Sequence, residues 1–341
     1  MLSRAVWLLA AVLLALPTIF ATWILVASTA FLIEFLSGER WHPLSAMTQT
    51  PVVQRIAIAA GPSPVVADLY VSAALRHPSG LVLVHGIAPL GRADPHLRAA
   101  ARLLARAGWA VAVPTVDGLT ALRLRPEDAG PVAGAARALD ALGYRPVALL
   151  SISLGAAPAL SAAGEPDVAG KLSAVLALGG YASAPELLRY TLTGAYGFEN
   201  TRGQHQVNED SIERFALANS ELLAGGGRAL VDNRDPGQVD PLVDVLPEST
   251  RRLLEALSPE NALPRVRAPL FLIHGRGDRT VPFTESLRLD RRAHKEGRQV
   301  RTIIVGAVGH VEPGARATVP ELAATWAAFY AFRVTSARAP R

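Results

Sequence analysis

The chain of 341 residues contains no cysteine and only two lysines, Lys171 and Lys295. The absence of cysteine excludes disulfide bonds, thiol nucleophiles and metal sites built on thiolates. It does not identify the compartment, because a chain without thiols is compatible with oxidising and reducing environments alike. The length is sufficient for one large core with an insertion or an anchor added to it.

The positive charge of the chain is almost entirely arginine, and the formal net charge is +5. A basic surface can attract nucleic acid or anionic lipid. Here the arginines are scattered singly, and they are not interleaved with aromatic residues in a nucleic-acid module. We therefore interpret the charge as a solvated surface and expect no nucleic-acid partner. No His, Asp and Glu residues have the spacing of metal ligands, so we expect no metal and no cofactor.

The N-terminus carries a long uncharged stretch. From Ala5 to Ile33 there are 29 residues without a charge. As a helix this stretch would extend about 43 Å and could cross a hydrocarbon core of about 30 Å. A signal peptide has an apolar region of only about 7–15 residues, so the length favours an uncleaved anchor. We predict a transmembrane helix within residues 1–36 and a linker over residues 37–51.

Two alternatives to this anchor remain open. A leader could be cleaved after a small residue such as Ala27, and two half-spans could turn at Pro17. If the helix is retained, Arg4 precedes it, whereas acidic and basic residues from Glu34 to Arg40 follow it. By the positive-inside rule, this slight bias favours a membrane-anchored chain whose main domain lies outside the cytoplasm.

Beyond residue 51, apolar runs rich in β-formers alternate with helical patterns. This alternation is typical of α/β proteins, in which helices cover both faces of a mainly parallel sheet. The first two runs predict an antiparallel pair, and the predicted strands are Val52–Ala59, Val65–Ala73, Leu81–Val84, Ala110–Val113, Val147–Leu150, Ala174–Leu178, Leu270–Ile273 and Val300–Val305. Helices are predicted over Pro95–Ala107, Pro126–Leu142, Leu154–Ala163, Val281–Lys295 and Pro320–Arg333.

Residues 184–267 interrupt the alternation. They contain no strong strand pattern, and their 13 acids and 9 bases give a net charge of −4 in a chain that is otherwise positive. This shift in composition marks an insertion, most simply a helical cap over the strand ends. The predicted core then consists of residues 52–183 and 268–335.

The strongest local signal is a strand that ends in Ser151-Ile152-Ser153-Leu154-Gly155 and continues into a helix of small residues. A nucleophilic serine at a tight strand-to-helix turn is pushed out of the sheet, and the following helix directs its N–H groups at an oxyanion. The segment resembles the nucleophile elbow of the α/β-hydrolases, Gly-x-Ser-x-Gly, with Ser151 in place of the first glycine. A serine that only caps the helix is the alternative interpretation.

A His85-Gly86-Ile87 segment follows the strand that ends at Val84. In the α/β-hydrolases a His-Gly turn at this place supplies the second oxyanion donor. The resemblance implies that the backbone N–H groups of Ile87 and Leu154 form the oxyanion hole. We interpret the side chain of His85 itself as structural.

Two further segments complete a serine–histidine–aspartate set. Asp278 follows the strand Leu270–Ile273 and is similar to the triad acid of the family, and His310 lies in a loop after the last predicted strand. The order serine, aspartate, histidine is that of the α/β-hydrolases. Asp278 could instead cap the next helix, and His310 could be a surface residue. The Gly275-x-Gly277 pattern lacks the third glycine of a dinucleotide-binding loop.

The resemblance extends to one branch of the α/β-hydrolases, the dienelactone hydrolase and prolyl-oligopeptidase-like enzymes. It is carried by Ala67-Asp68-Leu69-Tyr70, by Val281-Pro282-Phe283 and by Ser286. It implies a carboxylesterase-like serine hydrolase that cleaves small-molecule esters through an acyl-enzyme on Ser153, with Asp278 and His310 completing the triad. An acyltransferase, a peptidase and a non-catalytic membrane-tethered binding protein remain as alternatives.

Overall fold

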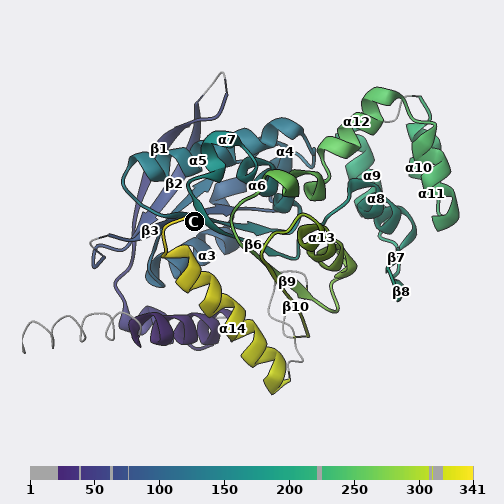
Figure 1. The fold of residues 1–341 in the computed structure, drawn as a ribbon. Coiled ribbons are helices and arrows are strands. Elements are labelled where there is room, and N and C mark those ends of the chain that lie inside the picture. Colours follow the sequence, from purple (N-terminus) through teal and green to yellow (C-terminus); the bar gives the residue numbers. More distant parts are fainter. Residues whose placement is uncertain are drawn as a thin grey trace, which may run out of the picture.

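The protein is described by a computed structural model that covers residues 22–37, 40–61, 64–75, 77–220, 225–306, 309 and 318–340. Its centre is an eight-stranded sheet in the order β1-β2-β4-β3-β5-β6-β9-β10 (Figure 1). The strands are β1 (Val52–Ala59), β2 (Pro64–Val71), β3 (Ser79–Val84), β4 (Trp109–Pro114), β5 (Val147–Ile152), β6 (Leu172–Leu178), β9 (Leu270–Gly275) and β10 (Val300–Val305). All eight predicted strands are present, with ends that differ by a few residues.

The sheet is antiparallel only at its first edge. β1 pairs antiparallel with β2, as predicted, and β2 pairs antiparallel with β4. From β4 through β3, β5, β6 and β9 to β10, every neighbouring pair is parallel. Because parallel strands point in the same direction, the loops that follow β3, β5, β6, β9 and β10 all leave from one edge of the sheet.

Side chains on alternate positions of each strand point to opposite faces, so one strand contributes to two cores. In β3, Val82 and Val84 pack in the core formed with α5, α6 and α13, whereas Leu81 and Leu83 pack in the core formed with α3 and α14. These helices are α3 (Pro95–Arg106), α5 (Ala129–Ala141), α6 (Ala156–Ala163), α13 (Thr284–Lys295) and α14 (Val319–Ser336). Helices therefore cover both faces of the sheet, as the apolar strands predict (Figure 1).

Local signals explain where the helices begin. The side chain of Asp94 accepts hydrogen bonds from the backbone of His96 and Leu97 and caps α3. Thr318 and Glu321 form a reciprocal capping box at the start of α14. Short helical segments complete the core: α2 (Pro43–Met47), η1 (Gly91–Ala93), α4 (Asp117–Thr120), η2 (Pro126–Asp128), η3 (Ser153–Gly155) and α7 (Pro166–Ala169).

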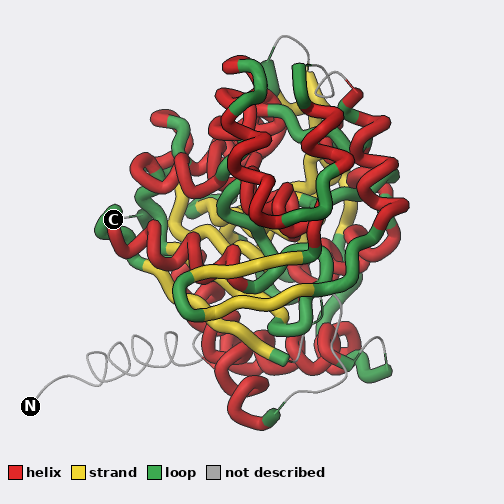
Figure 2. Tube along the Cα trace, turned by 90° about the vertical axis from the view of Figure 1, so that its right-hand side faces the viewer, coloured by secondary structure: helices red, strands yellow, loops and turns green. Residues whose placement is uncertain are grey.

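Residues 184–267 form a separate group of elements at one side of the sheet, and Figure 2 looks at the molecule from that side. The helices are α8 (Ala184–Thr193), α9 (Glu209–Ala218), α10 (Gly227–Asp232), η5 (Pro236–Gln238), α11 (Val239–Asp244), α12 (Glu248–Ala256) and η6 (Pro259–Arg265). A hairpin of β7 (Ala195–Phe198) and β8 (Thr201–Gln204) lies between α8 and α9 in the chain, and the sequence contains no strong strand pattern there. We call residues 184–267 the insertion.

The N-terminal helix, residues 22–36, lies against α14. Its side chains Ile24, Ala27 and Phe31 are buried, and the ring of Phe31 stacks on Phe329 with centroids 4.2 Å apart. The second half of the uncharged stretch thus packs on the domain. Within the part of the chain that the structure describes, no helix is both long and apolar enough to span a membrane. The first 21 residues of the predicted anchor lie outside the described residues.

The segment between this helix and β1 is fastened to the domain from residue 40 onward. Leu44 of α2 is fully buried. The N–H of Ser45 donates a 2.9 Å hydrogen bond to Glu34, and the guanidinium of Arg106 donates to the carbonyl of Thr48. The predicted linker region therefore makes specific contacts with the N-terminal helix and with α3.

Candidate active site

Ser153 occupies a strained turn between β5 and α6. It has a φ of +53°, one of three non-glycine residues with a positive φ among those the structure describes, and only 5% of its surface is exposed. A side chain in this region of backbone space costs about 1 kcal/mol or more, so the conformation persists only where the surroundings impose it. The turn leads directly into η3 and then into α6. This is the strand–turn–helix geometry that a nucleophile elbow requires.

Close backbone contacts impose the conformation. A Cβ atom added to Gly86 would lie 2.9 Å from the Cβ of Ser153, and one added to Gly155 would lie 2.5 Å from the carbonyl oxygen of His85. The loop after β3 therefore touches the turn after β5, and only glycine fits at both points. The last glycine of the Ser-x-Ser-x-Gly motif is explained by this steric requirement.

The departure from the family motif also has a structural explanation. Ser151 replaces the first glycine, lies in β5 opposite Val84 and Ala177, and is fully buried. Its hydroxyl reaches the carbonyl oxygen of Leu176 at 3.4 Å, toward the neighbouring strand β6. The extra atoms are thus accommodated within the sheet, away from the turn itself.

The two predicted oxyanion donors come from loops that the structure brings together. Ile87 directly follows Gly86, which touches Ser153. Leu154 lies in the first turn of η3, where backbone N–H groups have no acceptor within the helix. The assignment of Ile87 and Leu154 as donors remains a prediction, and its geometric precondition, contact between the two loops, is met.

The side chain of His85 has a structural role, as the sequence suggests. It is 1% exposed, and its Nε2 accepts a 3.1 Å hydrogen bond from the N–H of Val116. The proton must therefore be on Nδ1, which donates to the carbonyl oxygen of Gly86 at 2.7 Å. Burial lowers the pKa of His85. The neutral ring holds the loop after β3 in place and is not available as a base.

Asp278 lies in the loop after β9 and is 1% exposed. Its Oδ1 accepts hydrogen bonds from the N–H groups of Thr280 at 2.8 Å and Val281 at 2.9 Å. This is an Asx turn within the loop, because α13 begins only at Thr284. The carboxylate is therefore oriented by its own loop rather than serving as the helix cap. We call residues 276–283 the acid loop.

His274, at the end of β9, is a site residue that the sequence did not single out. It is fully buried, and its Nε2 lies 2.9 Å from the carbonyl oxygen of Val281 and 3.2 Å from Oδ2 of Asp278. Because a carbonyl only accepts, Nε2 carries the proton, and Nδ1 accepts from the hydroxyl of Ser286 at 2.7 Å. Nε2 thus supports the acid loop, and Nδ1 joins the end of β9 to α13. The His-Gly pair after the strand, together with Ser286, was the available signal.

His310 lies outside the described residues, so its pairing with Ser153 and Asp278 remains a prediction. The structure does define where its loop begins. β10 runs parallel to β9 and ends at Val305, whose carbonyl oxygen accepts a 2.7 Å hydrogen bond from the N–H of Arg276 in the acid loop. The chain toward His310 therefore leaves the same sheet edge as Asp278.

We call the turn at Ser153–Gly155 the nucleophile turn. The order of the strands brings this turn and the acid loop near each other. β5 and β9 are separated only by β6, so their axes lie about 10 Å apart at the usual strand spacing. Ser153 and Asp278 follow the two strands at this edge, so an imidazole on a neighbouring loop that bonds through both of its ring nitrogens is able to join them. Among the residues that the structure describes, no three His, Asp or Glu side chains gather as a metal site.

No family model and no curated protein matches the chain, whereas solved structures do. The acylaminoacyl peptidase of Pyrococcus horikoshii matches with a TM-score of 0.54 over 87% of this chain and 43% of its own, at 15% identity. A puromycin-hydrolysing peptidase of Mycobacterium tuberculosis matches with a TM-score of 0.53 over 83% and 38%, at 21% identity. A putative dienelactone hydrolase of Klebsiella pneumoniae matches with a TM-score of 0.52 over 84% and 99%, at 11% identity.

The chain has the α/β-hydrolase fold. The fold predicted from the elbow, the His-Gly turn and the chain order of Ser153, Asp278 and His310 is thereby confirmed, including its similarity to dienelactone hydrolases and to peptidases. The chain spans about two fifths of the length of the two peptidases and nearly all of the putative dienelactone hydrolase. Identities this low establish the fold alone.

Proposed function

We propose that this α/β-hydrolase chain is a serine hydrolase that cleaves carboxylic esters through an acyl-enzyme on Ser153. The observation that carries the proposal is the positive φ of Ser153 in a turn crowded by Gly86. A strained backbone is retained at a nucleophile because it exposes the hydroxyl to a substrate. A serine that merely capped a helix would not require this conformation.

In the proposed mechanism, Oγ of Ser153 attacks the acyl carbon while His310 accepts its proton and then returns it to the departing alcohol. Asp278 holds the imidazole in the reactive tautomer and stabilises the imidazolium. The N–H groups of Ile87 and Leu154 donate to the negative oxygen of the tetrahedral intermediate. Water then attacks the acyl-enzyme, and the same histidine removes its proton.

Replacing the nucleophile tests the proposal. Ser153→Ala should reduce the turnover of short p-nitrophenyl esters by a factor of about 10⁴ or more, because no acyl-enzyme can form. Ser161→Ala, in the following helix α6, is the matched control and should retain wild-type turnover. A fluorophosphonate probe should label the wild-type protein and the control, but not Ser153→Ala. Wild-type turnover by Ser153→Ala would refute the assignment.

A peptidase is the second candidate, and the similarity to two structures of peptidases favours it. The same serine chemistry cleaves amides, and the acceptor distinguishes a hydrolase from an acyltransferase. Offering esters, peptides and added alcohols to one preparation and comparing the products separates these three activities. A non-catalytic binding protein is the remaining alternative, and failure of the fluorophosphonate probe to label Ser153 would support it.

We also propose that the N-terminus holds the chain at a membrane, with the catalytic domain outside the cytoplasm. The support is the uncharged stretch from Ala5 to Ile33. Because residues 24, 27 and 31 are buried against the domain, the part left for lipid is residues 5–21, about the shortest length that spans a bilayer.

Fractionation tests the anchor. The full chain should stay in the membrane pellet after a carbonate wash, whereas a chain that begins at Thr22 should be released. Protease added to cells whose outer envelope has been removed, while the cytoplasmic membrane stays intact, should cleave the full chain if its domain is extracytoplasmic. Release of the full chain by carbonate would contradict the anchor.

A further inference from the structure

The peptide unit between Arg279 and Thr280 is held on both of its sides. Its N–H, from Thr280, donates to Oδ1 of Asp278 at 2.8 Å. Its carbonyl oxygen, from Arg279, accepts a hydrogen bond from the hydroxyl of Tyr190 at 2.8 Å. Because a peptide unit is planar and stiff, a group that fixes the carbonyl also fixes the direction of the N–H. Tyr190 therefore acts on the carboxylate of Asp278 through one rigid group.

Tyr190 belongs to the insertion, not to the sheet. It lies on α8, is 5% exposed, and contacts the acid loop at Arg279, whereas His274 of the core contacts it at Val281 and Asp278. Its burial and the negative charge of Asp278 both raise the pKa of its hydroxyl, so the hydroxyl stays protonated and can donate. The insertion thus supplies a donor to the loop that carries the proposed acid.

A second residue of the insertion holds the hydroxyl of Tyr190. The proton of this hydroxyl is directed at Arg279, so its oxygen accepts from Nδ1 of His205, 2.8 Å away. The backbone N–H of His205 donates to the carbonyl oxygen of Gly194, the C-cap of α8. A continuous chain of hydrogen bonds runs from His205 through Tyr190 and one peptide unit to Asp278. Such chains polarise and strengthen one another where they are shielded from water.

Aromatic packing restricts this chain. The ring of Tyr196 lies 6.1 Å from Tyr190, 5.1 Å from His205 and 6.1 Å from Phe283 of the acid loop, measured between centroids. Tyr190 therefore packs against Tyr196 and His205, and Tyr196 in turn contacts Phe283 of the acid loop. Tyr196 is in the same cluster, and no hydrogen bond joins its hydroxyl to the acid loop among the residues that the structure describes.

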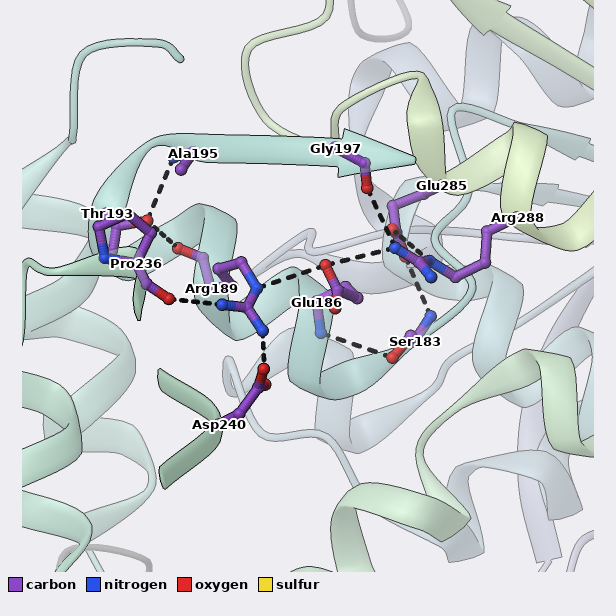
Figure 3. A network of polar contacts seen from close by, with 10 residues as sticks. All are labelled: Ser183, Glu186, Arg189, Thr193, Ala195, Gly197, Pro236, Asp240, Glu285 and Arg288. Atoms are coloured by element: carbon purple, nitrogen blue, oxygen red, sulfur yellow. Dashed lines mark hydrogen bonds and ion pairs between the residues drawn. The ribbon is translucent and has the colours of Figure 1, made fainter. Parts of the chain in front are cut away.

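Polar contacts hold α8 itself against the core, as Figure 3 shows. Arg288 of α13 pairs with Glu186 of α8 at 3.3 Å and donates to the carbonyl oxygen of Gly197 in β7 at 3.2 Å. Glu285, also on α13, accepts from the N–H groups of Ala182 at 2.9 Å and Ser183 at 3.0 Å, just before α8. These contacts fix the helix from which Tyr190 projects.

We propose that Tyr190, held by His205, is a positioning residue for Asp278, so that the insertion orients the acid of the catalytic triad. The proposal rests on the proposed function, in which Asp278 is that acid. Tyr190 does not contact the reacting atoms; it sets the direction of the N–H that holds the carboxylate. The insertion thus contributes to turnover itself, in addition to any contact that it makes with a substrate.

Removing one hydroxyl tests the proposal. Tyr190→Phe should lower kcat for a p-nitrophenyl ester about tenfold with KM unchanged, which is the upper end of what one hydrogen bond contributes. Tyr196→Phe, which removes a hydroxyl from the same cluster, is the matched control and should retain wild-type kcat and KM. Equal kcat in the two variants would overturn the proposal. Equal losses in both, with lowered Tm, would also overturn it, because they would indicate general loosening of the cluster.

The hydrogen-bond chain adds a second readout. His205→Ala should lower kcat about threefold, and His205→Asn should restore it, because an amide nitrogen can take the place of Nδ1. In the Tyr190→Phe background, His205→Ala should have no further effect on kcat, since the link to Asp278 is already broken. Additive losses in the double variant would contradict the chain.

A double variant separates this proposal from the proposed function. If Asp278 is the acid, Asp278→Asn lowers kcat strongly, and adding Tyr190→Phe to it changes nothing more. If Asp278→Asn is impaired but Tyr190→Phe matches Tyr196→Phe, the positioning role fails while the proposed function stands. If both Asp278→Asn and Ser153→Ala keep wild-type turnover, the proposed function fails, and the role of Tyr190 fails with it.

Discussion

The nucleophile turn and the acid loop leave the same edge of one sheet, yet they are held in different ways. Ser153 is fixed by steric contact, because the loops after β3 and β5 touch where Gly86 and Gly155 lie. Asp278 is fixed by hydrogen bonds, from its own loop, from His274 and indirectly from Tyr190 of the insertion. The nucleophile thus depends on local small residues, whereas the acid depends on residues far away in the chain.

The comparison is tested most strongly by neutralising the acid. Asp278→Asn keeps Oδ1, which accepts from Thr280 and Val281, and removes the charge that stabilises the imidazolium. We expect kcat for ester cleavage to fall by about 10³–10⁴ and the Tm to fall as well, because the amide nitrogen that replaces Oδ2 faces the N–H of His274. Asp140→Asn, in α5, is the control for loss of a carboxylate and should behave as wild type. A tenfold loss or less for Asp278→Asn would show that the acid is elsewhere.

Adding a methyl group to a glycine distinguishes the turn at Ser153, which is fixed by steric contact, from the acid loop, which is fixed by hydrogen bonds. Gly155→Ala places a Cβ 2.5 Å from the carbonyl oxygen of His85, whereas Gly277→Ala, in the acid loop, meets no atom within 4 Å. Overpacking should lower the free energy of unfolding by about 1–3 kcal/mol in Gly155→Ala. Gly277→Ala should leave it unchanged or raise it by up to about 1 kcal/mol. Urea denaturation of both variants measures the difference, and equal effects would remove the distinction.

A smaller effect concerns the contact between the insertion and α13. Burial raises the pKa of Glu285 above its ordinary value, against the opposing effect of the N–H groups of Ser183 and Ala182. A raised folded pKa means that the folded state binds the proton more tightly than the unfolded chain. The contribution of this group to stability is therefore largest below the ordinary value near 4.5 and is lost as the pH rises through the folded pKa.

The measurement compares two variants for which the free energy of unfolding should change with pH in opposite directions. Relative to Glu285→Gln, the wild-type free energy of unfolding should fall between pH 4 and pH 7. The pKa of Glu321 is lowered, chiefly by the N–H of Thr318, so relative to Glu321→Gln the wild type should gain stability as the pH rises from below 4. Stability differences that change with pH in the same direction for both residues would contradict one of the two expected directions.

Much of the core could be predicted from the sequence because its signals are local. The central strands β3, β4, β5, β6 and β9 are mainly apolar runs of six or seven residues that are buried almost throughout, and the elbow at Ser153 is marked by small residues within a few positions. Asp278 also comes shortly after the end of β9 in the sequence. Short-range patterns of this kind survive tertiary folding because the whole run is buried together.

The remainder depends on contacts between distant residues. His205 and Tyr190 are 15 residues apart, Tyr190 and Arg279 are 89 apart, and no periodicity connects them. The hairpin β7–β8 has four-residue strands that are only half-buried, so it produces no apolar run. His274 reads in the sequence as part of the loop motif, and its bonds to Val281 in the acid loop and to Ser286 on α13 appear only in the fold. The pairing of His310 stays a prediction.

The stacking of Phe31 on Phe329 makes the N-terminal helix a rigid extension of the α/β-hydrolase domain. The indole N–H of Trp326 also donates to the hydroxyl of Thr29 at 3.1 Å, which resists rotation of the helix about its own axis. Any restraint on residue 22 therefore also restrains the orientation of the sheet edge that carries Ser153 and Asp278. A dye attached at residue 25, on the exposed side of the helix, should tumble with the whole body and report its orientation.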